Sequence, residues 1–260
     1  METFMQSNKI AIIIPARYGS TRLPGKPLIK IKNKPIIQWV YEKARASKYA
    51  GNVIVATDDE RIYNVVKEFG NVQMTSPDHQ SGSDRIAEII RNNPEIEIAV
   101  NVQGDEPLIK PESIDKAIKA LIDNKDADIS TLIRKIDDKT ESNNPNVVKV
   151  VTANNGDALY FSRSPIPFER NEGQTPLYAH IGLYAYRRES LLKMTSLPQS
   201  PLEKAESLEQ LRALQNGMKI KTAVVDYKPI GIDTQEDVEY FSKLVEVFNP
   251  DFQQEFHCFR

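Results

Sequence analysis

Residues 9–27 read KIAIIIPARYGSTRLPGKP, and this stretch decides the fold class. The unbroken apolar run at 10–14 is typical of a strand that is buried on both faces of a parallel sheet. It ends in a loop that carries two glycines, three prolines and three cationic side chains, those of Arg17, Arg22 and Lys26. Ligands of open α/β sheets bind just beyond the carboxyl ends of the strands. The stretch therefore predicts an α/β fold with a site for an anionic ligand after its first strand.

The loop is suited to phosphate but fits neither of two familiar phosphate motifs. Its glycines allow backbone N–H groups to approach a phosphate, and its cations can donate charge-assisted hydrogen bonds. Five residues separate Gly19 from Gly25 and Pro27 follows Lys26, whereas a P-loop has four residues between its glycines and Ser or Thr after the lysine. The dinucleotide fingerprint Gly-x-Gly-x-x-Gly is also absent, which argues against a nicotinamide enzyme. The alternative is a basic surface loop without a ligand, which the buried strand before it disfavours.

Composition excludes several classes of protein. The 260 residues include 34 Lys and Arg against 36 Asp and Glu, and the net charge of −2 is not the electrostatic footprint of a nucleic-acid-binding protein. The lone cysteine, Cys258, cannot form an intrachain disulfide. No segment approaches the roughly 18 apolar residues of a membrane helix, and residues 1–8 lack the apolar core of a signal peptide. We expect a soluble cytoplasmic protein that binds neither nucleic acid nor membrane.

The first half of the chain alternates between strand-like and helix-like segments, which is the pattern of βαβ units in a parallel sheet. The predicted strands lie near 9–14, 52–56, 71–74 and 97–102, and the predicted helices near 35–48, 59–69, 83–92 and 111–124. Pro111 is placed at the first turn of the last of these helices, where a missing N–H costs nothing.

The middle of the chain changes character and predicts an antiparallel insertion. Turn signals at 143–146 and 154–157 separate strand-like segments. A single helix is expected over 200–216, because Ser200 and Glu203 have the spacing of a capping box and Gly217 follows the last periodic residue. The strands of the insertion are predicted at 128–136, 146–152, 158–161 and 177–187, and a strand at 219–226 and a helix at 234–247 would rejoin the main sheet.

These patterns divide the chain into parts. We expect an α/β core formed by 1–127 and 218–248, an insertion over 128–217, and a loosely held tail over 249–260. The apolar segment 181–186 has few helices nearby to cover both of its faces, and exposed apolar sheet surface normally marks an interface. The insertion is therefore expected to form the contact of a homodimer.

A second loop of chemical interest follows the predicted strand near 97–102. Gly104 permits a turn that presents Asp105 at the carboxyl edge of the sheet, where a carboxylate can bind Mg²⁺ together with substrate phosphates. Asp105 can equally be a turn residue bonded to its own backbone. Asp233 has a similar alternative, because Asp233 and Glu236 have capping-box spacing. Glu106 is expected to be a solvated neighbour of Asp105.

Seven blocks of sequence, in order over about 9–245, resemble the family of 3-deoxy-manno-octulosonate (KDO) cytidylyltransferases, the CMP-KDO synthetases. The first block is the loop at 9–27. The others are DHQSG at 78–82, NVQGDEP at 101–107, ALYFSR at 158–163, HIGLY at 180–184, LEQLR at 208–212 and GIDT at 231–234.

The resemblance implies a mostly parallel, Rossmann-like nucleotidyltransferase sheet flanked by helices, with the antiparallel insertion serving sugar binding and dimerisation. It implies transfer of CMP from CTP to the anomeric C2 hydroxyl of KDO, with release of pyrophosphate, as a step of lipopolysaccharide biosynthesis. Mg²⁺ would be the cofactor, with Asp105 and Asp233 as its ligands, and the protein would be a homodimer.

The resemblance also assigns roles to individual positions. The catalytic set would be Arg17, Lys26, Asp105 and Asp233. The nucleotide would be bound by Ala16, Arg17, Gly19, Ser20, Arg22, Lys26, Gln80, Ser81, Gly82 and Gln103. The sugar would be bound by His180, Tyr184, Glu209 and Gln210, with Arg163 as a candidate for the sugar carboxylate or a phosphate. Taken alone, Ser81 would be only a helix cap, Glu209 and Gln210 a solvated helix face, and His79 a surface residue.

Three alternatives remain beside this interpretation. A cytidylyltransferase for sialic acid is disfavoured, because such enzymes carry Gly-Gly-Ser-Lys where this chain has Tyr-Gly-Ser-Thr at 18–21. An enzyme for 8-amino-KDO is harder to exclude. A module that binds CTP without turnover would be expected to lack a metal carboxylate, yet Asp105, Asp233 and Lys26 are all present.

Overall fold

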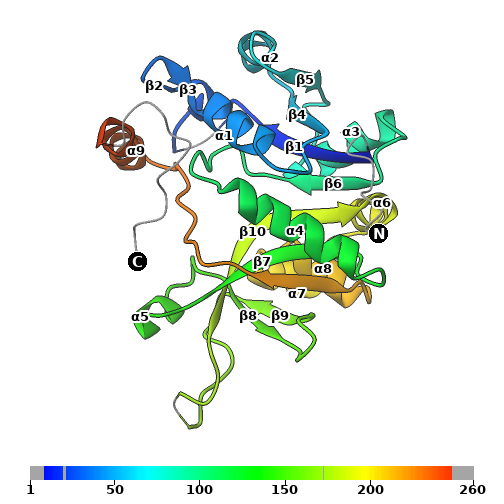
Figure 1. The fold of residues 1–260 in the computed structure, drawn as a ribbon. Helices are drawn as coiled ribbons and strands as arrows, with labels where there is room; N and C mark the ends of the chain where they lie inside the picture. The colour runs from blue at the N-terminus through cyan, green and yellow to red at the C-terminus, as the bar shows by residue number, and fades with distance from the viewer. Residues whose placement is uncertain (1–8, 20–21, 172, 248–260) are drawn as a thin grey trace.

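The structure is a computed structural model that describes residues 9–19, 22–171 and 173–247. Within these residues a nine-stranded sheet runs through the molecule, and seven of its strands follow the order β11-β7-β10-β6-β1-β4-β5 (Figure 1). The predicted tail at 249–260 lies outside the described residues. The seven strands are β1 (Ile10–Ala16), β4 (Asn52–Thr57), β5 (Asn71–Met74), β6 (Ile98–Asn101), β7 (Ile129–Lys135), β10 (Tyr178–Arg187) and β11 (Ile220–Val224).

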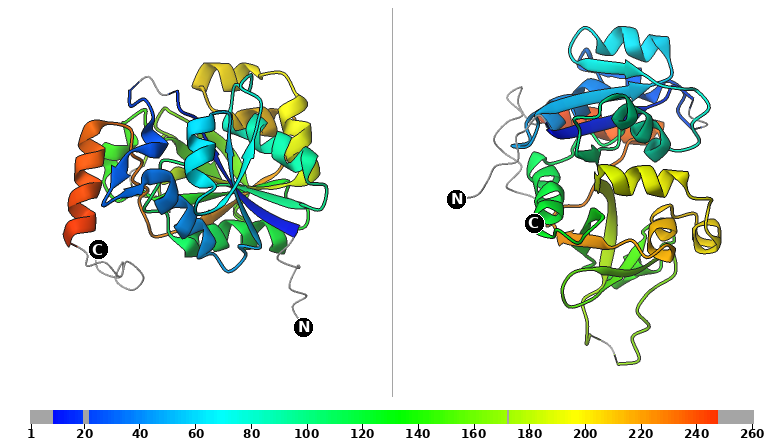
Figure 2. Two further views of the ribbon diagram at one scale, coloured as in Figure 1. Left: turned by 90° about the horizontal axis from the view of Figure 1, so that it is seen from above. Right: turned by 90° about the vertical axis from the view of Figure 1, so that its right-hand side faces the viewer.

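The remaining strands form two small antiparallel pairs. The hairpin of β8 (Lys149–Thr152) and β9 (Ala158–Ser162) joins the sheet through β10, at the end of the molecule opposite β5 (Figures 1 and 2). A separate pair is formed by β2 (Lys30–Ile31) and β3 (Lys34–Pro35). Segment 128–217, expected to be an insertion, therefore contributes β7 and β10 to the continuous sheet and β8 and β9 to a hairpin beside it.

Helices cover both faces of the sheet. On one face α1 (Ile36–Arg45), α2 (Glu60–Val66) and α4 (Pro111–Asp123) pack on the even-numbered isoleucines of β1. On the other face α3 (Gly82–Asn92), α6 (Arg188–Ser196) and α8 (Gln210–Gln215) pack on Ala11 and Ile13. Because β1 is buried on both faces, its sequence is continuously apolar, as predicted. Two further helices, α5 (Lys139–Ser142) and α7 (Pro201–Glu206), are short. No helix within the described ranges is both long and apolar enough to cross a membrane.

The final helix packs at one side of the sheet, against α1. It is α9 (Gln235–Val247), whose Val238, Phe241 and Val245 form a small third core with Ile36 and Trp39. The rings of Trp39 and Phe241 meet edge to face with centroids 5.7 Å apart. This packing brings the residues just before α9 back to the loop that follows β1.

Strand directions confirm the predicted fold class, a mainly parallel α/β sheet with added antiparallel strands. β1 runs parallel to β4 and β6, β4 to β5, and β7 to β11. β10 is antiparallel to both of its neighbours in the seven-strand path, β6 and β7. The carboxyl ends of the parallel strands therefore meet at one edge, and the first half of β10 extends beyond that edge to pair with β8.

An irregularity divides β10 into two halves. Ile181 pairs with Leu132 and Tyr184 with Thr131, so that Gly182 and Leu183 are extra residues on the β10 side. The hydroxyl oxygen of Thr131 lies 3.2 and 2.9 Å from the carbonyl oxygens of Ile181 and Leu183, where it helps to replace the interrupted ladder.

The helix predicted over 200–216 is wrong as a single element. The predicted capping box is present at its start, with both Ser200 and Glu203 contributing. The chain then leaves the helix at Ser207, whose φ of 51° is left-handed, and re-enters one at α8. A left-handed residue commonly ends a helix, but it is usually glycine, so a serine within an amphipathic pattern gave no warning.

A buried ion pair holds the two shortened helices together. Nε and Nη2 of Arg212 donate to the carboxylate of Glu203 over 2.8 and 2.5 Å, and these side chains are only 8% and 6% exposed. Removing one partner of such a pair leaves an uncompensated buried charge.

We therefore predict that Glu203→Ala lowers the free energy of unfolding by about 3 kcal/mol. The matched control is Asp123→Ala, which breaks a pair with Lys119 whose side chains are 52% and 58% exposed. This control should change stability by less than about 0.5 kcal/mol. Urea denaturation followed by circular dichroism measures both, and similar small losses in the two variants would contradict the prediction.

Candidate functional site

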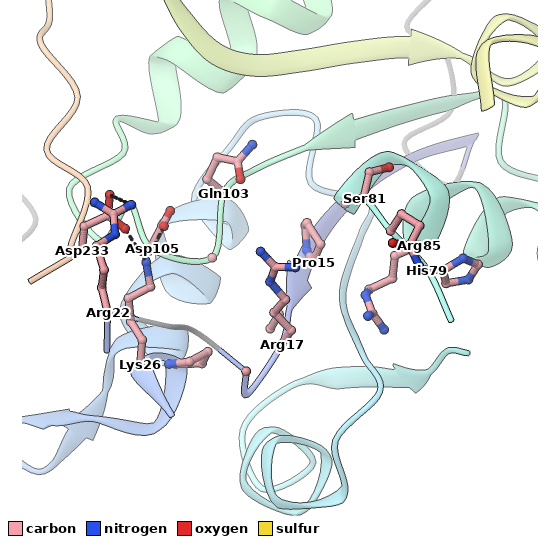
Figure 3. A pocket seen from close by; sticks show the side chains of 16 residues that line it. Pro15, Arg17, Arg22, Lys26, His79, Ser81, Arg85, Gln103, Asp105 and Asp233 are labelled. Atoms are coloured by element: carbon pink, nitrogen blue, oxygen red, sulfur yellow. Dashed lines mark hydrogen bonds and ion pairs between the residues drawn. The ribbon is translucent and has the colours of Figure 1, made fainter. Parts of the chain in front are cut away.

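A cavity of about 660 Å³ opens at the carboxyl edge of the sheet (Figure 3). Its walls come from the loops after β1 and β6, the N-terminus of α3, and Asp233 just before α9. The structure thus brings together four segments that are far apart in the sequence. All the predicted nucleotide-binding residues that it describes line this cavity, namely Ala16, Arg17, Gly19, Arg22, Lys26, Gln80, Ser81, Gly82 and Gln103. Ser20 lies outside the described residues.

Lys26 connects the two aspartates of the cavity. Its ammonium donates to Asp105 Oδ2 over 2.7 Å and to Asp233 Oδ1 over 3.0 Å, and Arg22 approaches Asp233 Oδ2 at 3.3 Å (Figure 3). Burial acts to lower the pKa of Lys26, but the hydrogen bonds and charges of both aspartates outweigh it and raise the pKa. Lys26 therefore stays protonated at neutral pH and holds both carboxylates toward one point.

This donor set fits a hard divalent cation. Both carboxylates already converge on one positive charge, and carboxylate oxygens supplemented by substrate phosphates are the usual ligands of Mg²⁺. In the part of the chain that the structure describes, no group of three or more His, Cys, Asp or Glu side chains is placed to hold a metal. A metal at this site would therefore depend on the substrate for part of its coordination.

The predicted alternative role of Asp233, capping the last helix with Glu236, is wrong by one residue. The cap is instead reciprocal between Thr234 and Asp237: the backbone N–H of Thr234 donates to the Asp237 carboxylate over 2.9 Å, and the Asp237 N–H donates to the threonine hydroxyl over 3.3 Å. The Asp237 carboxylate also accepts the N–H of Asp233 itself. The side chain of Asp233 is therefore left to face Lys26.

Glu106 differs from the solvated neighbour that was expected. It is half-buried, and the hydroxyl of Tyr227 lies 3.4 Å from its carboxylate. Burial and the adjacent charge of Asp105 raise the pKa of Glu106 to about 7.

The N-terminus of α3 forms the opposite wall. The hydroxyl of Ser81 accepts the N–H of Asp84 over 3.1 Å, which is the predicted cap, while Ser81 also lines the cavity. Ser83, two residues further along the chain, donates to Glu209 over 2.6 Å and so joins this wall to the segment before α8.

Five further residues line the cavity without having been assigned by sequence reasoning: Pro15, Pro27, His79, Arg85 and Gly104. Arg85 is 4% exposed and is held by Asp58 at 3.0 Å and by Thr75. His79 was expected at the surface, but it is half-buried and bonded to Glu88. The signal available for Arg85 was its position one turn into α3, where a cationic side chain faces the same edge of the sheet. The signal for His79 was its position next to Gln80 in the block at 78–82.

The predicted sugar-binding residues lie beside the cavity and are not part of its lining. His180 and Tyr184 share one face of β10, with ring centroids 5.3 Å apart. Gln210 is buried, and its Nε2 has no hydrogen-bond partner in the described part of the chain. Two contacts join this group to the cavity walls: Ser83 to Glu209, and Gln103 Nε2 to the carbonyl of Gly182 over 3.2 Å.

The sugar-binding candidates differ in electrostatic character from the charged cavity. Burial lowers the pKa of His180 to about 3, so its imidazole is neutral at physiological pH. Burial likewise raises the pKa of Tyr184 and that of Glu209. The neutral imidazole of His180 and the hydroxyl of Tyr184 both donate and accept hydrogen bonds, which suits them to hydroxyl groups more than to phosphates.

Arg163 has other partners in this structure. Its guanidinium donates to the backbone carbonyls of Glu206, Pro145 and Ser207 over 2.7, 3.0 and 3.4 Å, and its own N–H donates to the Glu206 carboxylate. These contacts clamp β9 to the end of α7. A substrate contact by Arg163 stays a prediction.

Comparison with known proteins identifies the family of this chain. Residues 11–220 match the family model described as cytidylyltransferase. The 3-deoxy-manno-octulosonate cytidylyltransferase of Solibacter usitatus is 51% identical over 238 residues, covering 91% of this chain and 94% of that relative. The enzyme of the same name from Thermodesulfovibrio yellowstonii is 51% identical over 251 residues, covering 91% and 98%.

A solved structure shows the same relationship. The CMP:2-keto-3-deoxy-manno-octonic acid synthetase complexed with CTP is 44% identical, with a TM-score of 0.88 over 92% of this chain and 99% of that one. The chain therefore belongs to the cytidylyltransferase family and, within it, to the 3-deoxy-manno-octulosonate cytidylyltransferases.

Proposed function

We propose that the protein transfers CMP from CTP to the anomeric C2 hydroxyl of KDO, giving CMP-KDO and pyrophosphate and activating the sugar for lipopolysaccharide biosynthesis. The observation that carries this is the convergence of Lys26, Asp105 and Asp233 in a cavity that adjoins a group of polar side chains, those of His180, Tyr184, Glu209 and Gln210. A polyanionic triphosphate matches the first part of the site, and a polyol matches the second.

In the proposed reaction the C2 hydroxyl of the sugar loses its proton to solvent water, and its oxygen forms a bond to the α-phosphorus as the bond to the bridging oxygen of pyrophosphate breaks. Arg17 and Lys26 stabilise negative charge on the triphosphate and on the departing pyrophosphate. Both residues belong to the loop after β1. The backbone N–H groups at the start of α3 offer further donors to an anion. Positioning and charge stabilisation supply the catalysis, so no covalent nucleophile is required.

We further propose Mg²⁺ as the cofactor, with Asp105 and Asp233 as its protein ligands. When bound, the ion would supply positive charge at phosphate oxygens and orient the two substrates. The fit of the donor set supports this, because both carboxylates face one cation already. A cytoplasmic location also remains our proposal.

The substrate itself is tested by one assay. Pyrophosphate release from CTP with Mg²⁺ should be measured across KDO, 8-amino-KDO and sialic acid. We expect turnover with KDO to be the highest. Faster turnover with the amino sugar would transfer the proposal to that substrate, and CTP binding without turnover would favour the non-catalytic module.

We predict that Asp105→Asn and Asp233→Asn each lower kcat by about 100-fold or more, since removing one electrostatic group from such a site has this effect. The control is Asp226→Asn, an exposed aspartate upstream of Asp233, which should keep normal activity. Circular dichroism checks that the fold is retained. Near-normal Mg²⁺-dependent activity in either variant would remove that residue from the metal site.

We predict that His180→Ala and Gln210→Ala raise the KM for KDO about tenfold or more, because each leaves a sugar hydroxyl without a partner. The affinity for CTP should change less than about twofold, since neither side chain lines the cavity. Exposed Gln174 provides a control as Gln174→Ala. Loss of CTP binding with normal KDO kinetics would show that this group does not bind the sugar.

We also propose a homodimer that forms through segment 128–217. The reason inferred from the sequence for this dimer, that apolar residues of 181–186 are exposed, is wrong. Ile181, Leu183 and Tyr186 are at most 2% exposed, because helices of both layers cover β10. Two other apolar side chains of the segment support the proposal, Leu159 at 61% and Phe168 at 90% exposure.

The predicted result is a dimer in sedimentation equilibrium at micromolar concentration. Leu159→Lys with Phe168→Lys should shift the protein toward monomer, because each change places a charge in an apolar contact. The control is Met74→Lys, at an exposed apolar residue on β5 at the other end of the sheet. A monomeric wild-type protein would refute the dimer.

A further inference from the structure

Arg61 makes an unusual contact with the loop that follows the first strand. Its guanidinium carbon lies 3.3 Å from the ring centroid of Tyr18, one residue after Arg17. Arg61 belongs to the first turn of α2, which follows β4, and β4 is the direct neighbour of β1. A guanidinium over an aromatic face is attracted by the ring quadrupole.

Asp59 fixes the orientation of this guanidinium. Nε and Nη2 of Arg61 donate to its two carboxylate oxygens over 3.0 and 2.6 Å. The same carboxylate accepts the N–H of Arg61 over 2.9 Å, so that it caps α2 as well. These hydrogen bonds, led by the one from the Arg61 side chain, lower the pKa of Asp59. The cation over Tyr18 is therefore anchored to a helix terminus.

Gly25 lies against the same tyrosine. A Cβ added to Gly25 would meet three atoms of the Tyr18 side chain at 3.0 Å, and the φ of +69° is one that glycine adopts without strain. The N–H of Gly25 also donates to the carbonyl of Tyr18 over 2.9 Å. The two ends of the loop are thus joined at Tyr18, immediately beside Arg17 and Lys26.

We propose that Arg61 is a positioning residue for CTP. By holding the Tyr18 ring, it keeps Arg17 and Lys26, the cations at the two ends of the loop, at a fixed distance from each other. This inference rests on the proposed use of CTP. Arg61 itself is not among the described residues that line the cavity, and its Nε and Nη2 donate to Asp59. Arg61 acts through Tyr18. It holds the loop after β1 in its binding conformation, so that the loop loses less conformational entropy when CTP binds.

The test measures CTP binding by calorimetry without sugar, together with steady-state kinetics. Arg61→Ala should raise the Kd and KM for CTP about threefold to fivefold, as the loss of one cation–π contact implies. The kcat and the KM for KDO should stay close to wild type. Arg61→Lys should not restore binding, because an ammonium cannot form the two-point contact with Asp59. The control is Arg91→Ala, at an exposed arginine of α3.

A double-mutant cycle separates this role from direct contact with phosphate. Tyr18→Phe, which keeps the ring, should bind CTP nearly as wild type does, and Tyr18→Ala should resemble Arg61→Ala. The double variant Arg61→Ala/Tyr18→Ala should be no worse than either single variant. Additive losses, or unchanged CTP binding by Arg61→Ala, would overturn the inference. Failure of the wild-type protein to bind CTP would instead refute the proposed function.

Discussion

The organisation of this site depends on the ammonium group of Lys26. Two carboxylates from the loop after β6 and the segment before α9 would repel each other without a cation between them. The contacts of 2.7 and 3.0 Å tie together parts of the chain that are 79 and 207 residues away from Lys26. The contact between Trp39 and Phe241 packs α9 against α1, and this packing places Asp233, just before α9, within reach of Lys26.

Charge is distributed unequally between the two halves of the site. Cations and anions face the cavity, whereas His180 and Tyr184 on β10 are uncharged at neutral pH because they are buried. This separation follows from topology. The loops at the carboxyl ends of the parallel strands are open to solvent and can carry charges, but the face of an internal strand cannot do so without partners. A substrate pair consisting of a polyphosphate and a polyol would fit such a division.

Sequence reasoning predicted the strands well because buried parallel strands are continuously apolar, and it predicted the cavity because loops after such strands share one edge. It failed where one residue decides the geometry. Ser207 takes a left-handed conformation that only glycine usually signals, and the cap of α9 moved from Asp233 to Thr234. It also missed Arg61, since a cation on a neighbouring element leaves no mark in the loop that it contacts. The roles of the sugar group came from family resemblance, because hydrogen-bonding capacity alone does not distinguish a pocket from a solvated face.

The irregularity in β10 restricts how this protein's sequence can change in length. Gly182 and Leu183 are an even number of extra residues, so His180 and Tyr184 remain on the same face despite the interruption. Deletion of one of them would turn every side chain on the far side of the gap to the opposite face, whereas deletion of both would keep the alternation. The number of extra residues at this position therefore matters more to the side-chain alternation of β10 than their identity does.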